Sequence, residues 1–429
     1  MPNSRDLPVK WSRNLTIYEV NLRQYTASGT FREFATHLPR LQKLGVGILW
    51  FMPIQPAGIE KRKGTRGSYY CISDYMSVDP AYGTLGEFKE LVSAIHQMGM
   101  YVILDWVAIH TSWDHQLTKT NPEFYKLDDK GAFKPPVTDW SDVIHLNYDN
   151  PAVAQYMIKA MQFWLYETDI DGFRCDMANL VPLSFWQNAR MELERIKPVF
   201  MLAEAEQREL LSGAFDAIYN WRLFHTFNRI ASGENSSWDL YSMLNYEIYA
   251  FPSSAYQMLF ISNHDENSWN GSELERLGEG LEAFAVLYFT LTGIPMIYSG
   301  QEAGLSKRLL FFDKDEIEWK EDKMFPLYQK LISLKKRNRA LWSGPYGGVL
   351  RRIETRNSGN VFAFMREVAG NKVIVMLNLS KHEQFAHLSV DNLPGYYKDI
   401  FADTQVELFD NHYFVLKPWE YRVFEFFTA

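Results

Sequence analysis

Short apolar runs alternate with amphipathic helical windows from about residue 15 to residue 340 of this 429-residue chain. This alternation is typical of a parallel α/β architecture, in which each strand is followed by a helix. Eight runs predict strands, at residues 16–20, 46–51, 101–105, 170–175, 199–203, 215–219, 257–261 and 294–298. We therefore expect an α/β fold in which eight units of about 30 residues close into a (β/α)8 TIM barrel.

The helix between the first two strands is the most clearly marked. Thr30 and Glu33 have the spacing of a capping box, and Gly45 is placed to end the helix as a C-cap. Between them the apolar side chains recur at helical intervals, at Phe34, Leu38, Leu41 and Leu44. We predict a single helix over residues 30–44.

Two segments do not follow the barrel rhythm. Residues 105 and 176 are 71 positions apart, so roughly 40 residues more than one unit leave the barrel after the third strand. Residues 111–146 show no helical period and predict a small inserted subdomain over the active-site face. After residue 345, runs with period-two alternation predict an antiparallel β-sandwich over 346–429. The barrel then comprises residues 1–110 and 147–345.

The composition indicates a large folded core, with 47% hydrophobic and 15% aromatic residues. A formal net charge of −8 gives no electrostatic reason to bind nucleic acid or an anionic membrane. The apolar run 283–298 is interrupted by polar residues and is shorter than the roughly 20 residues of a membrane span, so we expect a buried helix followed by a strand.

The two cysteines, Cys71 and Cys175, do not indicate a disulfide framework. The first eight residues contain no apolar stretch typical of a secretory signal. We expect a cytoplasmic protein, or a secreted or periplasmic one if a signal peptide has been removed.

Three carboxylates stand at the ends of predicted strands: Asp176, Glu204 and Asp265. Their separations of 28 and 61 residues correspond to one and two barrel units. Because the C-terminal strand ends form the active-site face of such barrels, we expect the three acids to converge. Two carboxyl groups about 5 Å apart can cleave a glycosidic bond with retention, one as nucleophile and one as acid/base. The spacing alone does not assign these roles among the three.

Four segments, 105–110, 172–176, 203–204 and 263–265, resemble in sequence and in order the motifs of the α-amylase family of glycoside hydrolases. The resemblance covers nearly the whole chain, including residues 67–75 after the second strand. It implies that Asp176 is the nucleophile, Glu204 the general acid/base and Asp265 the transition-state stabiliser.

The resemblance also implies a set of substrate-binding residues. His110 and His264 would bind sugar hydroxyls, Tyr70 would stack on the same sugar, and Asp105 belongs to the first motif. Trp113 and Trp269 are candidates for stacking at flanking subsites. Arg174 lies two positions from Asp176 and on the same face of the strand, so we expect it to keep that carboxylate ionised.

Ile109 departs from the family pattern, in which an Asn usually precedes the histidine and helps to bind a structural calcium ion. Isoleucine offers no oxygen ligand, and calcium takes six to eight of them. We expect this calcium site to be lost or weakened, with no cofactor required and no metal-binding residue assigned. Three acids of the predicted loops, Asp139, Asp142 and Asp149, are most simply solvated.

The sequence therefore predicts a retaining α-glycoside hydrolase that cleaves α-1,4 bonds of starch, maltodextrins or maltooligosaccharides. An α-glucan transglycosylase or glucosyl isomerase would use the same three acids, and the motifs do not separate these activities. A catalytically inactive glucan-binding protein is a more remote alternative, because all three acids are present. The barrel begins close to residue 1, without the preceding β-domain of dimeric cyclodextrin-degrading relatives, so we expect a monomer.

Overall fold

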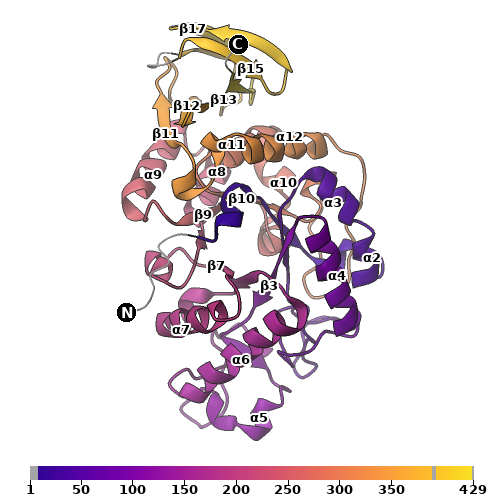
Figure 1. Ribbon diagram of the computed structural model, residues 1–429. Helices are drawn as coiled ribbons and strands as arrows, with labels where there is room; N and C mark the ends of the chain where they lie inside the picture. Colours follow the sequence, from indigo (N-terminus) through magenta and orange to yellow (C-terminus); the bar gives the residue numbers. More distant parts are fainter. Residues whose placement is uncertain (1–7, 389–392, 428–429) are drawn as a thin grey trace.

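Eight parallel strands close into a barrel in the computed structural model, which describes residues 8–388 and 393–427 (Figure 1). In the order in which they pair around the barrel, they are β1 (Ile17–Val20), β10 (Ile294–Tyr298), β9 (Tyr256–Leu259), β8 (Ala217–Tyr219), β7 (Phe200–Ala203), β6 (Gly172–Cys175), β3 (Tyr101–Trp106) and β2 (Ile48–Phe51). All eight predicted strands are confirmed. They read as continuous apolar runs because helices cover their outer face while side chains fill the barrel interior.

Helices surround this barrel (Figure 1). They are α1 (Leu22–Tyr25), α2 (Phe31–Ala35), α3 (Leu38–Leu44), α4 (Leu85–Gln97), α6 (Pro151–Thr168), α7 (Leu183–Glu194), α8 (Trp221–Ser232), α9 (Ser237–Ala250), α10 (Glu273–Leu277), α11 (Leu281–Thr290) and α12 (Met324–Arg337). The run 283–298 forms most of α11 and the whole of β10, as predicted. Residues 283–290 of α11 are all buried, which explains why this helix carries no polar stripe.

The single helix predicted over residues 30–44 is wrong, because the structure has two helices, α2 and α3, in its place. Pro39 has no amide hydrogen and cannot donate to the carbonyl of Ala35, so the first helix ends there. Both predicted ends are present: Thr30 accepts a hydrogen bond from the Glu33 amide, and Gly45 has a left-handed backbone with φ of 95°.

The segment after β3 leaves the barrel as a small two-stranded unit. Strands β4 (His110–Ser112) and β5 (Val143–His145) pair antiparallel, and α5 (Leu117–Thr120) and a 3-10 helix (Pro122–Phe124) lie between them. The hydroxyls of Thr111 and Tyr125 lie 3.0 Å apart and are buried. In Figure 1 this unit lies at the opposite end of the molecule from the C-terminal strands.

Two antiparallel sheets form a C-terminal sandwich. One has the order β11 (Val349–Ile353), β12 (Val361–Val368), β13 (Asn371–Asn378), β18 (Tyr421–Phe426), β15 (Gly395–Asp399) and β16 (Thr404–Leu408), and the other pairs β14 (Gln384–Leu388) with β17 (His412–Leu416). Apolar side chains from both sheets, among them Met365, Met376 and Leu416, pack into one buried cluster. The predicted fold class is therefore confirmed.

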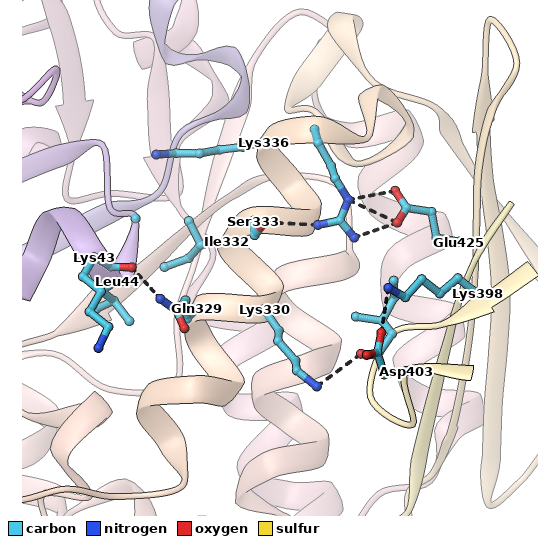
Figure 2. Close-up of a pocket in the computed structure, with 13 residues that line it drawn as sticks. Lys43, Leu44, Gln329, Lys330, Ile332, Ser333, Lys336, Lys398, Asp403 and Glu425 are labelled. Carbon is cyan, nitrogen blue, oxygen red and sulfur yellow. Dashed lines mark hydrogen bonds and ion pairs between the residues drawn. The ribbon is translucent and has the colours of Figure 1, made fainter. Parts of the chain in front are cut away.

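Polar groups join the sandwich to the barrel. The fully buried Arg366 of β12 donates to the carbonyl oxygens of Leu291 at 2.8 Å and of Trp342 at 2.9 Å. Nearby, α3, α12 and the sandwich line a groove of about 830 Å³, shown in Figure 2. Arg337 on α12 forms an ion pair with Glu425 of β18 at 2.6 Å, and both residues line the groove. None of the predicted site residues lines this groove.

The described part of the chain contains no helix with the length and apolar character needed to cross a membrane. Cys71 and Cys175 are both buried and free, so neither takes part in a disulfide.

Candidate active site

The three predicted acids meet at the carboxyl ends of the barrel strands. Asp176 comes directly after β6 and Glu204 directly after β7. Asp265 lies in the loop that follows β9. Asp176 and Glu204 are buried, whereas 39% of the Asp265 side chain is exposed at the mouth of the barrel. The predicted convergence on one face follows from the parallel direction of the strands.

Arg174 binds two of these acids from the interior of the barrel. Its Nη1 atom lies 2.9 Å from Asp105 Oδ1 and 2.9 Å from Asp176 Oδ1, and its Nη2 atom lies 2.9 Å from Glu204 Oε2. The Nε atom donates to the Tyr219 hydroxyl at 3.1 Å. The guanidinium is fully buried. Its planar fork can orient several oxygens at once, which a lysine ammonium does less well.

The charges of this cluster do not balance, because three carboxyl groups surround one guanidinium. Burial and then the Glu204 charge raise the pKa of Asp176 well above its ordinary value, and Arg174 opposes this rise. Burial likewise raises the pKa of Asp105, against the lowering effect of Arg174. Such a cluster retains a proton more strongly than isolated carboxylates do. It can therefore offer an ionised carboxylate and a protonated one side by side, which are the two groups that acetal cleavage requires.

The backbone after Asp176 also contributes to the site. Met177 has a left-handed conformation with φ of 40°, and its amide donates to Glu204 Oε2 at 3.0 Å. This oxygen also faces Arg174 Nη2. Oε2 is therefore held by one hydrogen bond, from the Met177 amide, and one ion pair, with Arg174, which together fix the orientation of the Glu204 carboxyl group.

His264 links a second set of residues. Its Nδ1 atom lies 2.6 Å from Glu19 Oε1, and its Nε2 atom lies 2.8 Å from the Tyr70 hydroxyl and 3.3 Å from Asp265 Oδ2. Burial alone would lower the pKa of His264, but the Asp265 and Glu19 carboxylates raise it well above its ordinary value. Burial alone would raise the pKa of Asp265, but the charge of His264 and its hydrogen bond lower it.

Tyr70 connects the two sets. Its hydroxyl donates to Asp105 Oδ2 at 3.1 Å, and its ring stacks on His264 with centroids 5.3 Å apart. The structure thus brings Tyr70, Asp105, Arg174 and His264 together with the three acids.

The other predicted site residues lie around this cluster. Trp269 is 51% exposed, and its ring lies tilted against Phe311 with centroids 5.1 Å apart. A side-chain hydrogen bond with Trp269 contributes to lowering the pKa of Asp265. His110 is buried, and this burial, followed by the charge of His145, lowers the pKa of His110 to about 3. Trp113 donates to the Ser141 carbonyl. Within residues 8–388 and 393–427, no hydrogen bond joins the His110 or Trp113 side chain to the residues gathered around Arg174 and His264.

Three residues of the cluster were not singled out from the sequence. Glu19 contacts His264, Trp50 donates to Asp105 Oδ2 at 3.1 Å, and Tyr219 contacts Arg174. Each is buried within a predicted apolar strand. The carboxylate of Glu19 inside such a run is a signal that could have been used, because a buried charge needs a partner.

The residues around Ile109 do not fit a calcium ion. The Ile109 side chain is buried and offers no oxygen. Asp142 faces the ammonium of Lys63 at 3.1 Å, while Asp139 and Asp149 are exposed. Over the part of the chain that the structure describes, no group of three or more His, Cys, Asp or Glu side chains is placed to hold a metal ion.

The barrel and its cluster of strand-end acids define an enzyme of the glycoside hydrolase class. The family model for the alpha amylase catalytic domain matches residues 16–134 and 137–323, so the chain belongs to the α-amylase family of glycoside hydrolases.

Three relatives place the chain within this family. The crystal structure of a noncanonic maltogenic α-amylase from Thermotoga neapolitana is similar with a TM-score of 0.89 and 29% identity, covering 97% of this chain and 99% of that one. An α-amylase structure from Lactobacillus plantarum gives a TM-score of 0.87 and 30% identity, covering 97% and 100%. A cyclomaltodextrinase from Bacillus sp is 28% identical over 395 residues, which are 82% of this chain but only 66% of that protein.

Proposed function

We propose that this protein is a retaining hydrolase of α-1,4-glucosidic bonds in starch, maltodextrins or maltooligosaccharides. The observation that carries the proposal is the Arg174 guanidinium, which holds Asp176 and Glu204 at 2.9 Å each on one edge of the barrel. The names of the relatives, a maltogenic α-amylase and a cyclomaltodextrinase among them, support an α-glucan as the substrate.

In this mechanism Asp176 is the nucleophile. Arg174 occupies its Oδ1 atom, which leaves Oδ2 to attack the anomeric carbon. The bond from that carbon to the leaving oxygen breaks as the bond to Oδ2 forms, and the product is a covalent glycosyl-aspartate. The positive charge that develops on the sugar ring faces Asp265, which His264 keeps ionised.

Glu204 is the general acid and then the general base. Its Oε2 atom is held by Arg174 and by the Met177 amide, which leaves Oε1 to carry the proton for the leaving oxygen. The same carboxylate then removes a proton from water, whose oxygen attacks the anomeric carbon and releases Asp176. Two inversions give net retention.

The experiment compares the wild type with Asp176→Asn on maltoheptaose, with products separated by chain length and their anomers followed by NMR. The wild type is expected to release the α-anomer first, and Asp176→Asn to lower kcat by roughly 10⁴-fold or more. Asp216→Asn is the matched control, because Asp216 is also buried beside an arginine, Arg190 at 3.0 Å, but stands before β8 at the other end of the barrel.

A β-anomer as first product, or full activity in Asp176→Asn, would show that the mechanism is wrong. The same reaction with added glucose tests the alternative activities, transglycosylation and glucosyl isomerisation. Products longer than the substrate, or isomerised disaccharides, would assign the site to transglycosylation or glucosyl isomerisation instead. We also propose a monomer, which light scattering on the purified protein can test.

A further inference from the structure

Glu19 is a buried carboxylate in the middle of an otherwise apolar strand. It is the third residue of β1 and has no exposed surface. Its Oε1 atom lies 2.6 Å from His264 Nδ1, and its Oε2 atom has no hydrogen-bond partner among the described residues. Burying a carboxylate costs several kcal/mol unless a charged partner compensates. A carboxylate at this position therefore needs a compensating partner, and His264 is the group that the Glu19 carboxylate contacts.

We propose that Glu19 is a positioning residue of the active site, which holds the His264 imidazole in its doubly protonated form. This inference rests on the proposed function and assigns a role to a residue outside the three acids. In the doubly protonated ring both nitrogen atoms are donors, so Nδ1 donates to Glu19 and Nε2 donates towards Tyr70 and Asp265.

The form of His264 sets the direction of a hydrogen-bond chain across the barrel. When Nε2 donates to the Tyr70 oxygen, the Tyr70 hydroxyl must give its own hydrogen to Asp105 Oδ2, at 3.1 Å. Asp105 Oδ1 in turn accepts from Arg174 Nη1, which also donates to Asp176 Oδ1. Glu19 and the nucleophile Asp176 therefore lie at opposite ends of this hydrogen-bond chain. Glu19 acts on Asp176 only through the residues between them.

A neutral His264 would reverse the first link. The Nε2 atom could then accept the Tyr70 hydrogen, and Asp105 would lose a donor in a buried site. The Asp265 carboxylate would also lose the adjacent positive charge that keeps it ionised. Both changes reduce the negative charge available to the transition state.

Several groups other than Glu19 act on the titration of His264. Asp265 Oδ2 lies 3.3 Å from Nε2, and the Tyr70 hydroxyl lies 2.8 Å from it. Asp105 lies one link beyond Tyr70 in this hydrogen-bond chain, and Arg174 lies one link beyond Asp105. Since Asp265 keeps its charge when Glu19 is replaced, part of the stabilisation of the imidazolium remains. A carboxylate in direct contact with a protonated imidazole raises the pKa of that imidazole by about 1–3 pH units.

The test uses three variants of the full chain. Glu19→Gln removes the charge with almost no change in shape, and Glu19→Asp retains the charge on a shorter side chain. Glu302→Gln is the matched control, because Glu302 is equally buried and bonded to Tyr18 and Arg40 rather than to His264. Two readouts are taken: the ¹⁵N NMR titration of labelled histidine, with the His264 signal identified by its loss in His264→Gln, and the pH profile of kcat/KM on maltoheptaose.

In Glu19→Gln, the midpoint of His264 deprotonation is expected to fall by about 1–3 pH units, and the alkaline limb of kcat/KM by a similar amount. Glu19→Asp should restore most of both shifts, and Glu302→Gln should leave both at their wild-type positions. The proposal is overturned if Glu19→Gln titrates like Glu302→Gln. If the wild type cleaves no α-glucan, the proposed function falls, while the NMR midpoint still decides the role of Glu19.

Discussion

The Nη2 atom of Arg174 lies 2.9 Å from Glu204 Oε2, although Arg174 lies in β6, Glu204 directly follows β7, and the two are 30 positions apart in the sequence. The same guanidinium faces Asp176 through Nη1. One buried cation therefore sets the distance and orientation between the two carboxyl groups that the proposed mechanism needs.

Replacing Arg174 with lysine should lower kcat by about 10²–10³-fold, because one ammonium cannot orient oxygens on three carboxyl groups. Steady-state kinetics on maltoheptaose measures the effect. Arg190→Lys is the control, since Arg190 is a buried arginine paired with Asp216 away from the site. Equal losses in the two variants would mean that Arg174 contributes only to folding.

Arg174→Gln tests the electrostatic part of the same relationship. Arg174 lowers the pKa of Asp176 against the effects of burial and Glu204. Removing the positive charge raises that pKa, so the ionised nucleophile forms only at higher pH. The acidic limb of the kcat/KM profile should move to higher pH, and an unchanged limb would contradict this assignment.

Trp269 offers an exposed ring beside Asp265. Its replacement with alanine should raise KM for maltoheptaose by roughly 3–10-fold, since an aromatic contact contributes about 0.5–1.5 kcal/mol. Trp269→Phe keeps the ring and should restore most of the affinity, whereas a loss equal to that of alanine would point to the indole hydrogen bond. Trp238→Ala is the control, because Trp238 is exposed to the same extent as Trp269, 49% against 51%, but lies on α9.

The burial of Lys335 should make the free energy of unfolding depend on pH. It is fully buried and donates to the carbonyls of Gly293 at 3.0 Å and Leu341 at 2.8 Å. Burial, and then the charge of Arg366, lower the pKa of Lys335 well below its ordinary value of 10.5. Between the folded pKa and 10.5 the unfolded chain binds more protons, so this lysine costs stability increasingly as the pH falls.

The variant Lys335→Met removes that cost and leaves two carbonyls without a donor. Its free energy of unfolding, relative to the wild type, should rise as the pH falls below 10.5, by up to about 1.4 kcal/mol per pH unit. Guanidinium unfolding over a series of pH values measures this difference. Lys330→Met, at an exposed position of the same helix, should show no such slope.

The residues around Ile109 predict that chelation has little effect. Incubation with EDTA should leave both Tm and kcat/KM of the wild type unchanged, because no oxygen is offered at Ile109 and Lys63 faces Asp142. Differential scanning calorimetry with EDTA and with added calcium tests this. A Tm that falls on chelation and recovers with calcium would place a cation site elsewhere in the protein.

Much of the site could be predicted from the sequence because barrel strands place their ends on one face. Asp176, Glu204 and Asp265 each follow an apolar run, so their convergence follows from strand direction. The break between α2 and α3 could also be predicted from the sequence, because Pro39 lacks an amide hydrogen. The apolar periodicity continues through Pro39, but the missing amide hydrogen ends the first helix before it.

The sequence by itself determined the eight strands, the inserted unit, the sandwich and the set of acids, because local apolar patterns and strand-end positions are properties of neighbouring residues. Only the tertiary structure decided that Arg174 faces Asp105, Asp176 and Glu204 together, and that Glu19 contacts a histidine 245 positions away. Such contacts depend on closure of the barrel, which brings β1 beside β10 and directs interior side chains from distant strands at one another. No local pattern contains that information.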